Sequence, residues 1–294
     1  MNRDFEIVTD SSCNLLENMI ETFGLHILPL TFMADGEDEV YQSYLKGEKT
    51  DLSQFYRMMR EGKVFRTSLP NQADTSELFR SLLEAGRDVL YIGFSSGLSG
   101  TYEATARIMD ELAADYPERK LYAVDTLAAS GGQGLLVWHA VQRAERGASI
   151  DEVRDWLEEN KLRLAHWFTV DDLMFLCRGG RVSKTSAAAG TVLNIKPVMH
   201  VDDEGKLVVT EKVLGRKKSL TALLDHMEKT ATRPIKEQMV FITHGDCLKD
   251  AQFLARQVKE RFGVRNVVIN CVDPVIGAHS GPGTMALFFL AEHR

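Results

Sequence analysis

The chain has 294 residues, of which 44% are hydrophobic and 26% charged, an ordinary composition for a globular protein. Its 35 basic and 42 acidic residues give a net charge of -7 without long blocks of either sign, so we expect no nucleic acid partner. The amino terminus has no apolar signal region and no apolar run reaches about 18 residues, so we expect a cytoplasmic protein without an integral membrane segment.

Strands and helices alternate through the first half of the chain. Short apolar segments predict strands over residues 5–9, 25–32, 88–94 and 120–126. Apolar residues at helical spacing predict helices over residues 15–23, 52–60, 101–115 and 127–146, with two more around 78–83 and 150–157. The polar stretch 34–50 is predicted to be a loop or the edge of a lid. This alternation favours a parallel sheet with helices on both faces.

Hydroxyl-rich segments stand at three points where an extended segment gives way to a helix. They are Thr9–Ser12, Thr67–Pro70 and Ser95–Thr101. In an open α/β sheet, ligands bind outside the carboxyl ends of the strands, where free backbone N–H groups and the positive end of a helix dipole favour anions. We therefore expect these loops to bind a phosphate or a carboxylate group.

The alternative explanation for single hydroxyls is helix capping, because Ser and Thr are common N-cap residues. Ser99 or Thr101 would cap the helix after the third segment, and Ser11 or Ser12 the helix after the first. Asp10 would then orient the neighbouring hydroxyls. The segment from Ser95 to Thr101 carries more small and hydroxylated residues than a cap needs.

In the second half of the chain, the predicted strands and helices do not alternate one by one. Its predicted strands cover residues 164–170, 197–201, 206–214, 238–243, 266–272 and 284–290, the second and third forming a hairpin. Its predicted helices cover residues 171–176, 183–194, 220–227 and 248–262. A cationic turn at Cys177–Arg181 and a glycine-rich loop at Gly277–Gly283 interrupt the pattern. A mixed sheet with helices on one face fits this half.

We therefore expect an α/β protein of two domains, since a chain of this length exceeds the size at which single cores usually divide. Residues 1–160 are predicted to form a three-layer α/β/α domain with a mainly parallel sheet and hydroxyl-rich ligand loops. Residues 161–294 are predicted to form a two-layer α/β domain with a mixed sheet.

Several common site signatures are absent from the sequence. Neither Gly97–Gly100 nor Gly131–Gly132 completes the dinucleotide-binding fingerprint, and the P-loop pattern does not occur. The histidines show no paired metal-ligand spacing, and the four cysteines form no Cys-x-x-Cys pair. We predict no cofactor, no metal site and reduced cysteines.

One catalytic pattern does occur, because Gly93–Gly97 satisfies Gly-x-Ser-x-Gly directly after a predicted strand. In a serine hydrolase of the α/β type, Ser95 would be the nucleophile of this elbow, and Asp273 with a later histidine would complete the triad in the usual order. Against this reading, Leu98–Gly100 separates the serine from the helix, and no His-Gly-Gly-Gly oxyanion loop is present. The hydrolase is our second hypothesis.

Five motifs in order along the chain resemble those of the DegV family. They are Thr9–Ser12, Thr67–Pro70, Ser95–Thr101, Gly179–Arg181 and His279–Gly283. That family comprises bacterial fatty acid-binding proteins, including the binding subunit of fatty acid kinase. The resemblance spans nearly the whole chain. It implies two α/β domains, with the fatty acid carboxyl group at their interface and the acyl chain in a buried apolar tunnel.

The resemblance also implies roles for individual residues. Those implied to bind the fatty acid carboxyl group are Thr67, Ser68, Ser96, Ser99 and Thr101. Those implied to lie near an acyl-phosphate head group are Arg181, His279 and Ser280, with Thr9, Asp10, Ser11 and Ser12 in support. The chain departs from the family pattern at Leu69, where the family has Gln, and at Ser280, where the family has Thr.

The leading hypothesis is a lipid-binding subunit that is not itself an enzyme. The resemblance implies that the chain buries a long-chain fatty acid and presents its carboxyl group to a partner fatty acid kinase for acyl-phosphate formation. The residue types agree, since hydroxyls and backbone N–H groups can satisfy a carboxylate that leaves water, and a guanidinium pairs well with phosphate. The chain supplies no nucleotide loop, metal cluster or general base, so we expect the partner to catalyse phosphoryl transfer.

Overall fold

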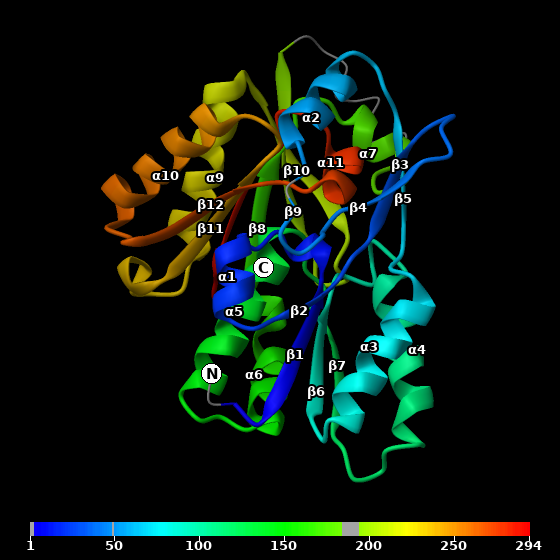
Figure 1. Ribbon diagram of the computed structural model, residues 1–294. Coiled ribbons are helices and arrows are strands. Elements are labelled where there is room, and N and C mark those ends of the chain that lie inside the picture. Colours follow the sequence, from blue (N-terminus) through cyan, green and yellow to red (C-terminus); the bar gives the residue numbers. More distant parts are fainter. Residues whose placement is uncertain (1–2, 49, 184–193) are drawn as a thin grey trace.

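The computed structural model describes residues 3–48, 50–183 and 194–294, and the strands of these residues form sheets A, B and C (Figure 1). Sheet A has the order β2-β1-β6-β7 and consists of β1 (Phe5–Asp10), β2 (His26–Leu28), β6 (Asp88–Gly93) and β7 (Leu121–Asp125). Sheet B has the order β4-β3-β5 and consists of β3 (Thr31–Ala34), β4 (Val40–Gln42) and β5 (Phe65–Ser68). Sheet C has the order β10-β9-β8-β13-β11-β12 and consists of β8 (Leu164–Thr169), β9 (Ile195–Val201), β10 (Leu207–Leu214), β11 (Met239–His244), β12 (Asn266–Cys271) and β13 (Met285–Leu290).

The helices surround these sheets. Those of the first half are the 3-10 helix η1 (Ser11–Cys13), α1 (Glu17–Thr22), α2 (Leu52–Arg60), α3 (Gln72–Glu84), α4 (Thr101–Ala113), α5 (Gly131–Glu145) and α6 (Ile150–Asn160). Those described in the second half include α7 (Met174–Arg178), α9 (Arg216–Thr230), α10 (Leu248–Phe262) and α11 (Pro274–Ser280). The helix predicted over residues 183–194 falls on residues 184–193, which lie outside the described residues.

Sheet A is the parallel sheet predicted for the first half, because each pair of neighbouring strands in it runs parallel. Helices α3 and α4 cover one face, and α5 and α6 cover the other (Figure 1). The side chains of strand β6 explain why helices cover both faces of the sheet. Val89 and Tyr91 pack toward α3 and α4, whereas Leu90 and Ile92 pack toward α5 and α6, so alternate side chains are buried on opposite faces. The predicted three-layer arrangement is confirmed.

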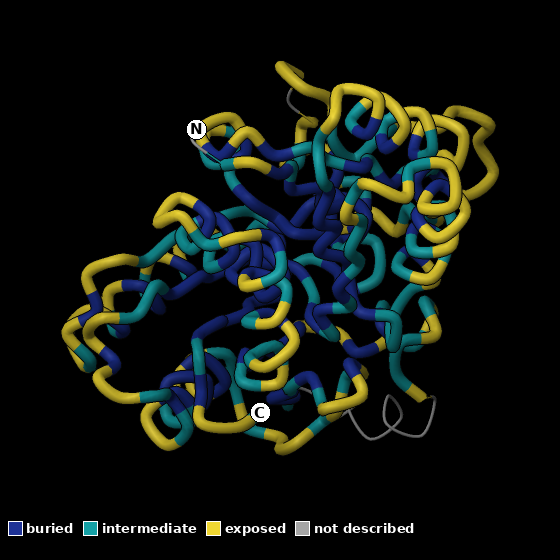
Figure 2. The backbone as a smooth tube through the Cα atoms, turned by 90° about the horizontal axis from the view of Figure 1, so that it is seen from below, coloured by how far each residue is buried: buried dark blue, intermediate teal, exposed yellow. Residues whose placement is uncertain are grey.

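Helix α5 lies between sheet A and sheet C and is buried along most of its length. Its residues Leu135 and Leu136 share one core cluster with Ile92 of sheet A and with Phe168 and Phe288 of sheet C. Figure 2 shows the buried segments gathered in the middle of the molecule and the exposed segments along its rim. The apolar surface of α5 is therefore buried against both sheets.

Sheet C is the mixed sheet predicted for the second half. Strands β11 and β12 run parallel, whereas the other neighbouring pairs are antiparallel, including the predicted hairpin of β9 and β10. Helices α9 and α10 cover its outer face, where Trp167, Leu223 and Leu254 belong to one core cluster. The inner face packs against α5.

Sheet B was not predicted, because the sequence over residues 25–32 reads as one strand. The chain instead forms β2 in sheet A and β3 in sheet B, with Pro29 between them. Proline has no N–H to donate to a strand ladder, so it suits the point where the chain leaves one sheet for another. The predicted loop over residues 34–50 contains β4, which pairs antiparallel with β3. Phe32 and Phe65 pack this small sheet against α2 and α11.

Two further segments predicted as loops belong to regular elements. Thr67 and Ser68 are the last residues of β5, paired with β3. His279 and Ser280 end helix α11, not a glycine-rich loop. That helix begins because the Asp273 carboxylate accepts hydrogen bonds from the first backbone N–H groups of α11, and because proline suits the first helical position.

The predicted start of α5 was also wrong. The sequence suggested a helix from residue 127, whereas the helix begins at Gly131. Leu127 and Ser130 have positive φ values of 49° and 53°, which a right-handed helix does not allow, so residues 127–130 form a separate segment before the helix. This segment places Ser130 beside the cavity described next.

Candidate ligand-binding site

A cavity of about 450 Å³ lies where the loops of sheet A meet the inner face of sheet C. The end of β5 and the segments after β1, β6 and β7 form one side of it, and strands β8, β9, β10, β11 and β13 form the other. Most of its wall is apolar and includes Phe94, Leu98, Phe168, Leu176, Val201, Leu207, Ala286 and Phe288. The volume is in the range of small-molecule sites.

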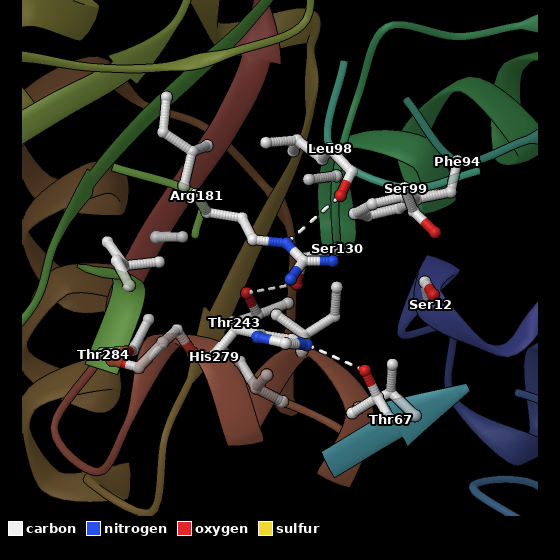
Figure 3. Close-up of a pocket in the computed structure, with 18 of the residues that line it drawn as sticks. Ser12, Thr67, Phe94, Leu98, Ser99, Ser130, Arg181, Thr243, His279 and Thr284 are labelled. Atoms are coloured by element: carbon white, nitrogen blue, oxygen red, sulfur yellow. Dashed lines mark hydrogen bonds between the residues drawn. The ribbon is translucent and has the colours of Figure 1, made fainter. Parts of the chain in front are cut away.

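Polar side chains from separate parts of the sequence gather at one part of this cavity. Figure 3 shows Ser12, Thr67, Ser99, Arg181 and His279 around a common space, and each comes from a different stretch of the chain. Ser68 and Ser280 also line the cavity. Seven of the residues selected from the sequence therefore contribute to one site, namely Ser12, Thr67, Ser68, Ser99, Arg181, His279 and Ser280.

His279 and Thr67 form a hydrogen-bonded pair, with 2.8 Å between His279 Nε2 and Thr67 Oγ1. Burial, and to a smaller extent the positive charge of Arg181, lower the pKa of His279 to about 4. The imidazole is therefore neutral near pH 7. Gly179 lies against the ring, because a Cβ at this position would collide with His279 Nδ1.

Arg181 is placed by the end of α7. Its backbone N–H donates to the carbonyl of Leu176 across Gly180, which has the left-handed φ of +75° that ends helices in this way. The guanidinium donates to the carbonyl oxygens of Leu98, at 3.2 Å, and of Gly179. Burial lowers the pKa of Arg181 from its usual value. Within the part of the chain that the structure describes, Arg181 makes no ion pair with a carboxylate.

Two hydroxyls of the cavity wall have unused hydrogen-bonding capacity. Ser12 Oγ and Ser280 Oγ are buried and have no hydrogen-bond partner among the residues that the structure describes. Ser99 Oγ lies 2.9 Å from Thr101 Oγ1, and one of the two hydroxyls donates to the other. A buried hydroxyl without a partner costs free energy, so a polar ligand group at this end of the cavity would be favoured.

The expected supporting residues hold the loops together. Asp10 Oδ2 accepts hydrogen bonds from Tyr91 Oη, the backbone N–H of Phe94 and Gln133 Nε2, at 3.0–3.1 Å. Burial raises the pKa of Asp10, and these donors oppose that change. Thr9 Oγ1 donates to the carbonyl of Ile92. The end of β1 is thereby fastened to the end of β6.

The first loop is not capped as the sequence suggested. Asp10, not Ser11 or Ser12, is the N-cap of η1 and accepts from the backbone N–H of Ser12. Ser11 Oγ accepts from the backbone N–H of Leu30 and lies 2.6 Å from Ser43 Oγ. Helix α1 is a separate element that begins without a side-chain cap.

Five of the selected residues do not line the cavity. They are Thr9, Asp10, Ser11, Ser96 and Thr101. Ser96 donates its backbone N–H to Asp125 Oδ1 at 3.2 Å, which holds the loop after β6 near the end of β7. Thr101 lies behind Ser99 at the start of α4.

Sequence reasoning missed a buried polar chain that reaches the cavity. Asn14 Nδ2 donates to Asp273 Oδ1, Ser130 Oγ donates to Asn14 Oδ1 at 2.6 Å, and Ser130 Oγ lies 3.0 Å from Thr243 Oγ1. Burial raises the pKa of Asp273 to about 6. Ser130 and Thr243 line the cavity. Their local sequences carry no motif, so only their convergence reveals them.

The hydrolase hypothesis gains no support from this geometry. Ser95 is fully buried, and its hydroxyl donates to the carbonyl of Gly205 at 2.9 Å, not to a histidine. A serine nucleophile needs a neighbouring base and access to a substrate.

Among the described residues no group of three or more His, Cys, Asp or Glu residues could hold a metal ion, and no helix there is long and apolar enough to cross a membrane.

The comparison with protein families gives a match over almost the whole chain. A family model described as "Uncharacterised protein, DegV family" matches residues 4–292. The chain belongs to the DegV family. The matched residues contain all five motifs that suggested this family, from Thr9–Ser12 to His279–Gly283.

Individual DegV proteins match over their full lengths. A DegV domain-containing protein of Clostridium perfringens is 42% identical over 292 residues, which is 99% of this chain and 99% of that protein. A fatty acid-binding DegV family protein from Thermus thermophilus has a TM-score of 0.84 and 29% identity, covering 98% of this chain and 99% of that chain. A DegV lipid-binding protein from Thermotoga maritima has a TM-score of 0.84 and 27% identity, with 99% of each chain covered. These likenesses confirm the predicted fold.

Proposed function

We propose that this chain binds one long-chain fatty acid in the cavity and presents its carboxyl group to a partner fatty acid kinase. The observation that carries the proposal is the division of the cavity wall. Most of the wall is apolar, whereas hydroxyls and Arg181 gather at one part of it. The fatty acid-binding DegV protein from Thermus thermophilus, which has the same fold, supports this reading.

The apolar wall supplies the binding free energy. Burying about 14 methylenes at roughly 0.8 kcal/mol each gives a gross gain of about 11 kcal/mol. The loss of translational and rotational freedom on association removes a large part of it. The carboxylate must then be satisfied where it leaves water, since an unpaired buried charge would cancel much of the remaining gain.

The proposed carboxyl site consists of Thr67 and Ser99, with Ser68 at the exposed edge of the cavity. Because His279 Nε2 lies at hydrogen-bond distance from Thr67 Oγ1, an N–H there would leave the Thr67 hydroxyl proton for the ligand. Thr101 supports Ser99 in the same way, and Ser96 holds the loop through its backbone. Ser12 and Ser280 offer further hydroxyls to the head group.

Arg181 and His279 are proposed to matter most for the phosphorylated ligand. A guanidinium binds phosphate oxygens in pairs, and Arg181 makes no ion pair within the described residues that would compete. The carboxylate of a free fatty acid uses fewer of these donors. We propose that the partner kinase supplies the nucleotide and the phosphoryl-transfer machinery, so the chain itself is not an enzyme.

Native mass spectrometry of protein purified without added lipid tests the binding proposal. We expect a bound mass that equals one fatty acid. Thr67→Ala and Ser99→Ala should each weaken fatty acid binding by about 1–3 kcal/mol, because a desolvated carboxyl oxygen loses a donor. Ser81→Ala, on the exposed face of α3, is the matched control. Absence of any fatty acid, both after purification and after incubation with one, would refute the proposal.

The kinase step needs a separate experiment with a cognate fatty acid kinase and ATP. Arg181→Ala should bind free fatty acid within a few-fold of the parent protein and yet yield little acyl phosphate. Arg178→Ala, at the last residue of α7, is the control, because its side chain lies over Phe175 and does not line the cavity. Normal acyl-phosphate formation by Arg181→Ala would remove the proposed role of the guanidinium.

A further inference from the structure

Helix α11 begins at a buried carboxylate. Asp273, which the sequence suggested as a member of a catalytic triad, is the N-cap residue of α11 and is only 9% exposed. Its Oδ2 accepts a hydrogen bond from the backbone N–H of Val275, and its Oδ1 accepts one from the backbone N–H of Ile276, both at 3.1 Å. Oδ1 also accepts from Asn14 Nδ2 at 3.0 Å. The carboxylate therefore joins the start of α11 to the segment that follows β1.

These three partners are all donors, so the site suits the ionised form of Asp273. A protonated carboxyl group carries an O–H that must donate, and a backbone N–H cannot accept from it. Asn14 cannot turn its amide oxygen toward Asp273 without losing the bond that Ser130 Oγ donates to Asn14 Oδ1 at 2.6 Å. Ser130 Oγ in turn lies 3.0 Å from Thr243 Oγ1 in the cavity wall (Figure 3). Proton uptake by Asp273 therefore costs the cap at least one hydrogen bond.

A second cavity connects this buried carboxylate with the surface. It has a volume of about 520 Å³, and Asp273 and Asn14 both line it. Its wall also includes exposed residues, namely Asn18, Glu48 and Thr50. Asp273 can therefore exchange a proton with solvent while the chain stays folded.

Burial raises the pKa of Asp273 to about 6, although its three donors oppose the change. The titratable groups that face it from the elements packed around it are Asp10, Cys13, Tyr56 and Cys271, with Glu17 and Glu48 in the wall of the second cavity. Burial raises the pKa values of Cys13, Tyr56 and Cys271, so these groups stay uncharged in neutral solution. Proton uptake by Asp273 therefore falls between about pH 7 and about pH 5.

The other end of α11 belongs to the ligand site. The helix has seven residues, and its last two, His279 and Ser280, line the main cavity. His279 Nε2 lies 2.8 Å from Thr67 Oγ1 (Figure 3). A helix of about two turns has few backbone hydrogen bonds, so its cap supplies a large share of its stability. Helix α11 thus connects Asp273 with the hydroxyl of the proposed carboxyl site.

We propose that Asp273 is a proton-sensitive cap of α11, whose protonation loosens this helix and weakens ligand binding at Thr67 and His279. The inference rests on the proposed function. The cap is complete above about pH 7 and is lost as the pH falls through about 6. The same proton removes the cost of burying a charge and so stabilises the fold as a whole, while the start of α11 loses an acceptor.

Hexadecanol tests this inference, because its hydroxyl does not titrate and carries no charge that would repel Asp273. The measurement is its partition between delipidated protein and phosphatidylcholine vesicles, from about pH 7.5 to about pH 5. The parent protein should bind hexadecanol about five-fold or more weakly at the acid end, with a midpoint near pH 6. Asp273→Asn, which stays uncharged, should bind it weakly at each pH.

Asn14→Gly is the second variant, since it keeps Asp273 and removes one donor to the ionised form. Glycine adopts the positive φ of 48° at this position without strain. The midpoint of this variant should move to higher pH. Asp51→Asn is the matched control, because Asp51 caps α2 at the surface by accepting from the backbone N–H of Gln54. It should keep the parent profile.

A parent protein that binds a fatty acid but shows no pH-dependent binding of hexadecanol would overturn the inference while the proposed function stands. An unchanged profile in Asp273→Asn would do the same. An unchanged midpoint in Asn14→Gly would overturn the inference even if Asp273→Asn does not fold. If the parent binds neither a fatty acid nor hexadecanol, the proposed function and the inference both fail.

Discussion

The loops that follow β1 and β6 carry similar residue types and use them differently. Both stand at the carboxyl ends of neighbouring parallel strands, and both are rich in hydroxyls. In the β1 loop, Thr9 and Ser11 are bonded within the protein, and only Ser12 lines the cavity. In the β6 loop, Ser95 bonds to the hairpin turn and Ser99 lines the cavity.

The difference lies in which backbone groups each loop must satisfy. The β1 loop carries Asp10, which gathers donors from β6, α5 and its own 3-10 helix. These hydrogen bonds fix the position of the β6 loop relative to the β1 loop. Thr9 and Ser11 bond to the backbone groups of Ile92 and Leu30, whereas the Ser12 hydroxyl has no partner among the described residues. The following predictions test that division between structure and binding.

The largest effect is expected for Asp10→Ala, which removes the acceptor shared by Tyr91, Phe94 and Gln133. Leaving these buried donors unsatisfied should lower the free energy of unfolding by about 3–5 kcal/mol. Urea unfolding measures the change. Asp115→Ala, at an exposed carboxylate, is the control. Equal losses in the two variants would contradict the structural role given to the β1 loop.

The next effect concerns pH and His279, which faces both loops from α11. Its pKa is about 4 in the folded protein and 6.5 ordinarily, so the folded state disfavours protonation. Stability from this group is therefore present above pH 6.5 and lost as the pH falls toward 4, on the order of 3 kcal/mol in total. His279→Gln, which can still bond to Thr67, should lack this loss.

The measurement is the difference in unfolding free energy between parent and His279→Gln, both delipidated, from pH 7 to pH 4. Subtracting the two unfolding free energies removes the contribution of Asp273, whose titration changes stability with pH in the opposite direction. Its pKa is raised to about 6, so its contribution is lost as the pH rises from about 4 to about 6. His293→Gln, at an exposed histidine, is the control. A difference that stays constant with pH would show that His279 is not held neutral.

The smallest effect separates two adjacent serines of the β1 loop. Ser11→Ala should lower the free energy of unfolding by about 1–2 kcal/mol, because the buried N–H of Leu30 loses its acceptor. Ser12→Ala should change stability by less than about 0.5 kcal/mol, since its hydroxyl has no partner, and should weaken fatty acid binding instead. Thermal melts and binding calorimetry on both variants distinguish the two roles. The reverse pattern would mean that Ser12 is the structural residue.

The sequence by itself determined the order of most elements and indicated seven of the polar residues that line the cavity. Local periodicity predicted α2 and α10 at the bounds that they have, and the buried run at Asp88–Phe94 predicted β6 to within one residue. Seven residues chosen from motifs line one cavity. The helix and strand predictions succeeded because their periods depend on residues close together in the chain. That the seven residues bind a ligand stays a prediction.

Only the tertiary structure decided which polar groups face the cavity and where its apolar wall ends. Ser130, Thr243 and Asn14 meet because α5 packs between two sheets. The meeting of Ser95 with Gly205 joins residues 110 positions apart. No local pattern encodes such contacts, since they depend on how helices and sheets pack. A serine or threonine in such a loop therefore gives the same sequence signal whether its hydroxyl binds a ligand, caps a helix or bonds to a neighbouring loop.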